Sequence, residues 1–330
     1  MATDNPAQTI MALSTAYWAS RCLHVAAELG VADALGDAPE TAEALAGKLG
    51  VRPDPLKRIL RCLVNHGIFA LADDRFAHNA ASRLLASGPR SMRSLPRMMG
   101  LPMHWAAYGE LERSVRTGAP AIEAVVPEGI FARFDANPEE GRLFDEAMTG
   151  KAMGVVGPVA ATYDFSGLGV IGDIGGGAGH LLSAVLDAAP AAQGVLFDLP
   201  PVVARAAERA HPRVRYVGGD FFKDPIPACD AYLLMTVLHD WSDAECVEIL
   251  GAVRRAAPPG AKLLVVEAVI APEQGGGDFA VDLDIEMLVM TTGRERTGPE
   301  WSDVFARGGF RLTRVIPTGT WCAIIEGEVA

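Results

Sequence analysis

The second half of this chain repeats one pattern, in which a strand-length apolar segment is followed by a segment with helical periodicity. The strand-like segments are "GVIGDIG", "AQGVLFDLP", "VRYVGGDFF", "DAYLLMTVL" and "AKLLVVEAVI", and amphipathic stretches follow most of them. Such alternation is typical of an open parallel sheet with helices on both faces. The pattern therefore constrains residues 161–330 to an α/β architecture.

The end of the chain follows a different pattern. Two strand-like segments, "FRLTRVIPT" and "TWCAIIEGE", are joined by only a few residues, which is too short a connection for a parallel crossover. We therefore predict that the last strand runs antiparallel. A mostly parallel, Rossmann-like sheet that ends in an antiparallel hairpin distinguishes class I methyltransferase sheets from dinucleotide-binding ones.

The first 160 residues lack this alternation. Residues 1–100 read as helices with one hairpin, "GIFALADDRFAHN", and this order predicts a winged helix. The first helical stretch, "TIMALSTAYWASRCLHVAAELGVADAL", is apolar almost all round, so we expect a partner subunit to bury it. Residues 101–160 read as a helical connector whose last helix starts at Asn137 and Pro138. The predicted domains are therefore 1–100, 101–160 and 161–330.

Composition limits the possible partners and the compartment. The formal net charge of -12 would repel a phosphate backbone, which argues against nucleic acid. No apolar stretch approaches the ~20 residues that a membrane helix needs, and the N-terminus lacks the pattern of a signal peptide. The five cysteines are scattered and form no CxxC motif, as expected for free thiols in a reducing compartment. These features predict a cytoplasmic enzyme or regulator.

A glycine-rich loop, "DIGGGAGH", lies directly after the first of these strands and before a helix. Glycine lets the backbone turn tightly there and lets a ligand approach closely. The nicotinamide fingerprint would need a glycine where His180 stands, and the Walker lysine is missing as well. An acid followed by alternating glycines suits S-adenosylmethionine, whose ammonium group would face carboxylates. The candidate residues are Asp173, Gly175, Gly177 and Gly179.

Two further acids follow the next two strands. Asp198, in "FDLP", lies about 20 residues beyond the glycine loop, where an acid is placed to bind ribose hydroxyls. Asp220, in "GGDFF", stands beside Phe221, and this pair could hold an adenine ring. A single strand-end aspartate more often caps a helix or a turn. Three acids at successive strand ends favour a cofactor site.

The segment "TVLHDWSD" places His239 at the end of the fourth predicted strand, at the same edge of the sheet. Glu267 ends the next strand, so its carboxylate is expected to accept a hydrogen bond from one ring nitrogen and leave the other as a base. Glu295, on a later loop, is a second candidate for orienting the ring. A base would serve attack by a phenol, because only about a thousandth of a phenol with a pKa of ~10 is ionised at neutral pH. A purely structural role for His239 is the alternative.

These motifs, with "VVE" and "GRERT" after them, resemble those of the S-adenosylmethionine-dependent small-molecule O-methyltransferases of the caffeic-acid type, the bacterial natural-product branch included. The resemblance covers nearly the whole chain and implies methylation of a phenolic hydroxyl on an aromatic small molecule. It implies that His239 is the general base, flanked by Glu267 and Glu295. It also implies a homodimer through the winged-helix domain, which closes over the acceptor. The cofactor residues that it implies are Gly175, Asp198, Leu199, Asp220 and Phe221.

The chain departs from the resemblance at one position. Plant members often carry a lysine four residues before the histidine, where this sequence has Met235, which we keep among the cofactor candidates. For the acceptor, we expect the connector helix and the segment before "GRERT" to supply a pocket, since methionine lines adaptable apolar pockets. Each of these residues could equally be ordinary core. The acceptor candidates are Phe144, Met148, Met153, Asp240, Met287, Met290 and Thr291.

Three other interpretations stay open. A winged helix can bind DNA, and several basic residues lie near its second helix, although a DNA-binding module would not need the site in the second half. The methyl group could go to nitrogen or carbon, or the activity could have diverged. A metal is not expected, because the seven histidines are spread out and catalytic metal sites cluster their ligands. The acceptor, the methylated position and the pathway are not encoded in any of these motifs. The basic residues are Arg52, Lys57, Arg58 and Arg61.

Overall fold

The computed structural model describes residues 5–208, 210–271 and 279–330. Its internal contacts divide the chain into two compact units. Unit 1 contains Met1–Gly109 and Ala124–Lys151, and unit 2 contains Glu110–Glu123 and Ala152–Ala330. Each unit is thus assembled from separate stretches of sequence, whereas the predicted domains are three consecutive segments. Among the described residues, no helix has both the length and the apolar character needed to cross a membrane.

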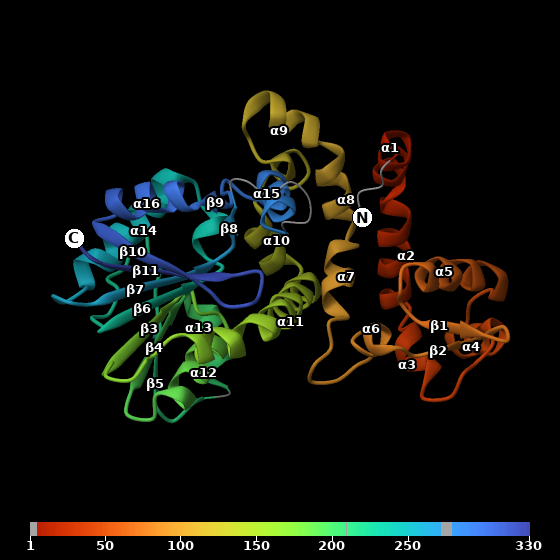
Figure 1. Cartoon of the computed structure of the whole chain (residues 1–330), viewed down its shortest axis with the longest axis horizontal. Helices are drawn as coiled ribbons and strands as arrows, with labels where there is room; N and C mark the ends of the chain where they lie inside the picture. The colour runs from red at the N-terminus through yellow and green to blue at the C-terminus, as the bar shows by residue number, and fades with distance from the viewer. Residues whose placement is uncertain (1–4, 209, 272–278) are drawn as a thin grey trace. The chain divides into compact units, whose positions relative to one another are not determined.

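Unit 1 begins with a winged-helix arrangement (Figure 1). Its core includes Leu45, Leu60 and Phe76, which are fully buried. By contrast, α1 has no buried residue. The order of helices and hairpin is the predicted one, but the first helical stretch is divided into α1, α2 and α3. The elements are α1 (Pro6–Thr15), α2 (Tyr17–Glu28), α3 (Val31–Leu35), α4 (Ala42–Leu49), α5 (Pro53–Asn65), β1 (Ala70–Ala72), β2 (Arg75–Ala77) and α6 (Ala80–Arg83).

The hairpin of unit 1 turns at Asp73 and Asp74. Both residues have positive φ angles, 48° and 59°, as in a type I′ turn, whose twist matches that of two antiparallel strands. The carboxylate of Asp74 lies 2.6 Å from Lys57 Nζ and 3.8 Å from Arg61 Nη2. Two of the basic residues beside the predicted DNA-binding helix are therefore paired within the unit, which weakens the regulator hypothesis.

The remaining part of unit 1 is helical. The long helix α11 begins at Pro138, as predicted, because proline at the first helical position has no N–H to satisfy. It runs to Thr162, so its last turns belong to unit 2. The elements are α7 (Ser94–Met99), α8 (Pro102–Gly109), α10 (Ile130–Ala136) and the first part of α11 (Pro138–Thr162).

Unit 2 is built on a seven-stranded sheet with the order β10-β11-β7-β6-β3-β4-β5 (Figure 1). Strands β3 to β7 run parallel, and β11 pairs antiparallel with both β7 and β10. This confirms the predicted mostly parallel sheet with a C-terminal antiparallel hairpin. The strand order reverses between β3 and β6, and ligands bind beyond the carboxyl ends of strands at such a point. The strands are β3 (Val170–Ile174), β4 (Gln193–Asp198), β5 (Val214–Gly218), β6 (Ala231–Met235), β7 (Lys262–Glu267), β10 (Phe310–Pro317) and β11 (Ala323–Val329).

The sheet is buried on both faces, because successive side chains along a strand point in opposite directions. Phe197 and Tyr232 pack under α14 and α16, whereas Leu196 and Leu233 pack under α12, α13 and the end of α11. Figure 1 shows these two layers of helices around the sheet. The helices are α12 (His180–Ala188), α13 (Pro200–Ala207), α14 (Asp243–Ala256) and α16 (Gly298–Arg307). Unit 2 also contains α9 (Leu111–Thr117), η2 (Leu238–Asp240), β8 (Val269–Ile270), α15 (Phe279–Met290), β9 (Arg296–Thr297) and all but the last residue of η1 (Ala121–Ala124).

Candidate active site

The glycine loop connects β3 to α12. Gly175, Gly177 and Gly179 have φ angles of 68°, 56° and 75°, which other residues rarely adopt. A Cβ on Gly175 would lie 3.0 Å from Val237, and one on Gly179 would lie 2.8 Å from Leu196. A Cβ on Gly177 would meet nothing within 4 Å. Two of the glycines therefore allow close packing of the loop, and the middle one leaves open space beside the backbone.

Asp173 lies beneath this loop. Its side chain is 1% exposed, and its Oδ2 has no hydrogen-bond partner among the described residues. Burial, together with the charge of Asp198, raises the pKa of Asp173 to about 7. A buried carboxyl oxygen without a partner is costly, and a cationic ligand group would remove that cost. The site thus fits the ammonium group of S-adenosylmethionine.

Asp198 is the last residue of β4, as predicted. Its Oδ2 accepts a hydrogen bond from Gly177 N at 2.8 Å, and its Oδ1 accepts one from Leu199 N at 2.7 Å. The carboxylate therefore ties the glycine loop to the end of β4, a role that the sequence did not indicate. A carboxylate oxygen can accept more than one hydrogen bond, so these two bonds do not by themselves prevent Asp198 from binding hydroxyl groups.

Asp220 and Phe221 follow β5 and stand among aromatic rings. Asp220 accepts from Phe222 N at 2.9 Å and lies 2.8 Å from Lys223 Nζ, and the bond to Lys223 lowers the pKa of its carboxyl. The ring of Phe221 makes edge contacts with those of Phe222 and Trp241, at centroid distances of 4.9 and 5.9 Å. Phe222 and Trp241 were not predicted as site residues. The sequence could have indicated them, because Phe222 follows Phe221 directly and Trp241 follows Asp240, and both of those residues were predicted.

His239 does not end a strand, which corrects the prediction. Strand β6 stops at Met235, Thr236 adopts a φ of 51°, and the buried His239 lies in the 3₁₀ turn η2. The apolar run that reads as one long strand is thus a short strand followed by a turn. Hydrophobic periodicity cannot reveal this break, because the turn is stabilised by a side chain from another strand.

That side chain is Glu267, the fully buried last residue of β7. Its Oε1 accepts hydrogen bonds from the backbone N–H groups of Val237, Leu238 and His239 at 2.9, 3.0 and 3.3 Å. Its Oε2 is 3.6 Å from His239 Nδ1, too far for a good hydrogen bond. Glu267 therefore holds the backbone of the turn. The prediction that it accepts a hydrogen bond from the histidine ring is wrong. Burial raises the pKa of its carboxyl.

Glu295 orients the histidine ring instead. Its buried Oε1 lies 2.7 Å from His239 Nδ1, and its own backbone N–H donates to Asp284 Oδ1 at 2.8 Å. The other ring nitrogen, Nε2, lies 3.7 Å from Asp240 Oδ1. Burial alone would lower the pKa of His239, but the negative charges of Glu267, Asp240 and Glu295 outweigh it and raise the pKa to about 9. The arrangement fixes one nitrogen and gives the ring a high affinity for a proton.

Gly293 is a site residue that sequence analysis missed. A Cβ at this position would lie 1.9 Å from His239 O and 2.5 Å from the backbone nitrogen of Trp241. Thr291 supports the same loop, since its hydroxyl accepts from Gly293 N at 3.0 Å and donates to Met287 O at 3.1 Å. Only glycine allows the "GRERT" loop to approach the histidine turn so closely.

The acceptor candidates of unit 1 lie in a small core. Phe144 and Met148 pack against Met98, Leu143 and Ala147. This placement agrees with the interpretation that they are ordinary core residues.

The acceptor candidates of unit 2 differ in exposure. Met287 and Met290 are buried, whereas Met153 is an exposed apolar residue. Asp240 adjoins the histidine, as described above. Met235, kept as a cofactor candidate, ends β6 and is only partly buried. Asp240 therefore lies in the histidine turn. The methionines range from buried to exposed, so they do not line one common surface as the sequence suggested.

The side chains of His239, Glu267 and Glu295 could also suit a metal ion, because their ligand atoms all lie within 4.8 Å of one another. However, Glu267 Oε1 already accepts three N–H groups, and Nδ1 of the histidine is engaged by Glu295. We therefore interpret the cluster as a hydrogen-bonded proton-binding site.

A mostly parallel sheet closed by an antiparallel hairpin, with its glycine loop at the switch point, is the fold of the class I methyltransferases. Residues 108–311 match the O-methyltransferase domain, and residues 11–88 match the O-methyltransferase dimerisation domain. The chain therefore belongs to the O-methyltransferase family, and its cofactor is S-adenosylmethionine. The resemblance seen in the sequence is confirmed.

Individual relatives match along almost their full length. The chain is 40% identical to the phenazine O-methyltransferase PhzM of Lysobacter antibioticus, covering 97% of this chain and 95% of the relative. It is 37% identical to the 8-amino-8-demethylriboflavin N,N-dimethyltransferase of Streptomyces davaonensis, covering 92% and 90%. Among solved structures, CalO1, a methyltransferase in calicheamicin biosynthesis with SAH bound, gives a TM-score of 0.88 at 32% identity, covering 99% and 100%.

Proposed function

We propose that this O-methyltransferase acts on a phenolic hydroxyl of a flat aromatic small molecule, with His239 as general base. The observation that carries the proposal is the 2.7 Å contact between Glu295 and Nδ1 of the buried histidine. A ring held through one nitrogen has a fixed orientation, so Nε2 is the atom that takes the proton. The name of the phenazine relative supports an aromatic acceptor.

The proton affinity of His239 suits this acceptor. A phenol has a pKa of about 10, and the pKa of His239 is about 9, so the proton can pass between groups of similar affinity. A placed base contributes about 10²–10⁴-fold, and alignment of the reacting atoms contributes up to roughly 7–11 kcal/mol. Glu295 and Glu267 would stabilise the imidazolium that forms, because their negative charges lie beside the ring.

The cofactor would lie along the carboxyl ends of β3, β4 and β5. S-adenosylmethionine supplies the electrophilic methyl group when bound. In the proposed assignment Asp173 faces the ammonium group, Asp198 accepts from the ribose hydroxyls, and the rings around Phe221 hold the adenine. The unpartnered Oδ2 of Asp173 and the open space beside Gly177 support this assignment. Leu199, Asp220 and Met235 complete the proposed set.

The acceptor would contact the exposed Met153 and the region near Asp240, Met287, Met290 and Thr291 in unit 2. Methionine side chains adapt to flat apolar ligands. The two candidates in unit 1 are left out of this proposal, because they pack in a core of that unit. They are Phe144 and Met148.

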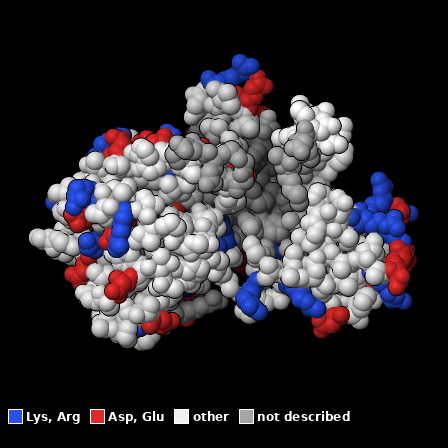
Figure 2. All heavy atoms as spheres, viewed as in Figure 1, with Lys and Arg blue, Asp and Glu red and all other residues white. Residues whose placement is uncertain are grey.

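We also propose that the protein is a homodimer formed through unit 1. Ile10, Met11 and Leu13 of α1 are 68%, 70% and 74% exposed, and residues 5–20 contain no charged side chain. In Figure 2 the surface of α1 shows neither Lys or Arg nor Asp or Glu. An apolar surface of this kind on a chain with a dimerisation domain is best buried by a second copy.

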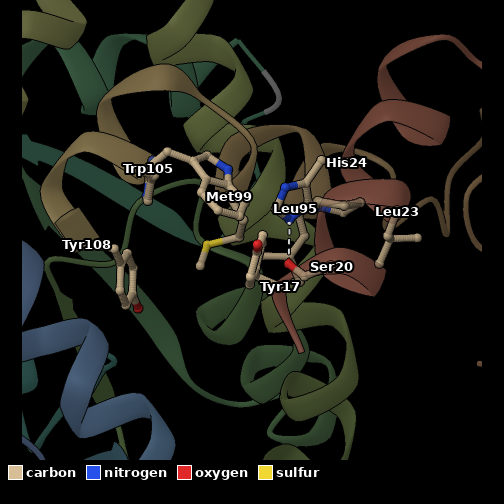
Figure 3. Close-up of a pocket in the computed structure, with 10 residues that line it drawn as sticks. Tyr17, Ser20, Leu23, His24, Leu95, Met99, Trp105 and Tyr108 are labelled. Atoms are coloured by element: carbon tan, nitrogen blue, oxygen red, sulfur yellow. Dashed lines mark hydrogen bonds between the residues drawn. The ribbon is translucent and has the colours of Figure 1, made fainter. Parts of the chain in front are cut away.

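Residues of α2, α7 and α8 line an apolar pocket of about 550 Å³ in unit 1, in which Tyr17 and Ser20 lie near Met99 and Trp105 (Figure 3). A partner helix inserted there would bury further apolar surface.

All five cysteines are free thiols, which supports a cytoplasmic location.

The test of the catalytic proposal is methylation of a panel of acceptors. Purified protein is incubated with S-adenosylmethionine and with matched hydroxy and amino derivatives of phenazines, benzoates and quinones, and mass spectrometry detects the gain of one methyl group. We expect products from hydroxy acceptors and a loss of about 10²–10⁴-fold in His239→Ala. The exposed His66 provides the control, and His66→Ala should retain activity.

Other outcomes would redirect the proposal. Methylation of the amino derivatives alone would move the reaction to nitrogen, as the name of the riboflavin-type relative suggests for that protein. Full activity of His239→Ala would eliminate the base and leave alignment as the source of rate.

A further inference from the structure

We infer that Arg296, the arginine of "GRERT", is a positioning residue that holds the turn carrying His239. This inference rests on the proposed role of His239 as base. The side chain of Arg296 is fully buried in unit 2, where an arginine is costly unless its charge and all its donors are satisfied.

Every donor of the guanidinium has an acceptor. Arginine has five N–H groups in a rigid planar fork. One set of acceptors lies on the histidine turn, and a second set lies at the start of α14 and in the "GRERT" loop itself. The acceptors are Leu238 O at 3.2 Å, Trp241 O at 2.9 Å, Arg294 O at 3.1 Å, Asp243 Oδ1 at 2.9 Å and Cys246 Sγ at 3.4 Å.

These bonds complement those of Glu267. Glu267 accepts from the N–H groups of the turn, and Arg296 donates to the carbonyls of Leu238 and Trp241, which flank the histidine. A short 3₁₀ turn has few hydrogen bonds of its own, so its geometry depends on such neighbours. Two buried side chains thus fix the backbone of the turn, Glu267 through its N–H groups and Arg296 through its carbonyl groups.

Arg296 also follows Glu295 directly in sequence. The same short segment therefore holds both the backbone of the turn and the imidazole ring. Trp301 covers the guanidinium, with its ring centroid 5.1 Å from Cζ, and Asp243 Oδ1 lies 2.8 Å from Nη2. These contacts leave the guanidinium one orientation, which a more flexible cation would not share.

Lysine cannot replace this arrangement, because it has three donors on one nitrogen and no planar fork. We expect Arg296→Lys to reduce kcat about 10²-fold, the effect of a misplacement of roughly 1 Å at a reacting group. The affinity for S-adenosylmethionine, measured by calorimetry without acceptor, should stay within about twofold of the wild type, because the only bond from Arg296 to the proposed adenine-binding residues goes to the backbone carbonyl of Trp241, not to its ring.

A double-mutant cycle with His239→Ala tests the inference. If Arg296 acts through the histidine, Arg296→Lys costs about 10²-fold in the wild-type background and almost nothing in the His239→Ala background. Equal losses in both backgrounds would overturn the inference. A wild-type rate in His239→Ala alone would instead refute the proposed base, so the two failures are distinguishable.

A second readout needs no acceptor. We expect a proton on His239 Nδ1, shared with Glu295, to give a downfield proton resonance, which Arg296→Lys should shift or abolish. An unchanged resonance would contradict the inference. Arg213→Lys is the matched control, because Arg213 donates to Leu186 O, Ala189 O and Ala192 O at the opposite end of the strands. This control should lower Tm without changing kcat or the resonance.

A milder variant covers the case in which Arg296→Lys does not fold. Asp243→Asn weakens the bond to Nε but keeps the guanidinium in place. We expect a smaller loss of kcat than for Arg296→Lys, again absent in the His239→Ala background, and a loss that persists there would count against the inference.

Discussion

Replacement of Asp173 by asparagine should make the apoprotein more stable at high pH and weaken cofactor binding. Asp173 is 1% exposed, and burial and the charge of Asp198 raise its pKa to about 7. In the unfolded chain the same group has its ordinary pKa of 3.8. The folded protein therefore retains a proton that the unfolded chain releases, and the wild type loses stability as pH rises from 3.8 to about 7.

The magnitude follows from the size of the shift. At pH 8 the full difference of about three pKa units, at 1.36 kcal/mol each, lowers the free energy of unfolding of the wild type by about 4 kcal/mol. At pH 5, which is only slightly above the ordinary pKa of 3.8, the loss is about 2 kcal/mol. Asparagine does not titrate, so the variant escapes this loss. Its buried amide group costs about 1–3 kcal/mol at every pH, because it lacks a full set of partners. The free energy of unfolding of the variant relative to the wild type should therefore rise by about 2–3 kcal/mol between pH 5 and pH 8.

Urea unfolding of both proteins at the two pH values measures this change. Asp187→Asn, the same substitution at an exposed position of α12, is the control and should change by less than about 0.5 kcal/mol. Calorimetry should show weaker S-adenosylmethionine binding in Asp173→Asn, since the ammonium group loses its carboxylate. A stability difference that does not change with pH would refute the argument that burial raises the pKa of this carboxyl.

Three further predictions concern other parts of the molecule. Gly293→Ala should reduce kcat by about 10²-fold or more, because its Cβ would lie 1.9 Å from His239 O, whereas Gly298→Ala, with nothing within 4 Å, should keep its rate. The logarithm of kcat/KM should rise with pH up to about 9, since the neutral imidazole is the base, and this limb should vanish in His239→Ala. Leu13→Asp should give a monomer in analytical ultracentrifugation, whereas Arg58→Asp on the polar surface should not; a dimer in both variants would move the interface elsewhere.

Much of the fold and of the proposed cofactor site is encoded locally. The sequence places a strand, a glycine loop and a helix in succession, and positive φ angles at Gly175 and Gly177 follow from that order. Likewise, Asp198 ends β4 as expected, because strand ends in such a sheet lie at a common edge. The short final connection alone is enough to predict the antiparallel hairpin. Each of these inferences depends only on residues that lie close together in the sequence.

The surroundings of His239 were decided by tertiary structure alone. Glu295 is 56 residues away in sequence and Glu267 is 28, so spacing could not tell which carboxylate meets the ring and which holds the turn. The contacts of Gly293 and Arg296 with this turn arise in the same way, from separate segments that meet in the folded unit. The physical reason is that periodicity reports which face of an element is buried, whereas the partner of a buried polar group depends on how strands and loops pack.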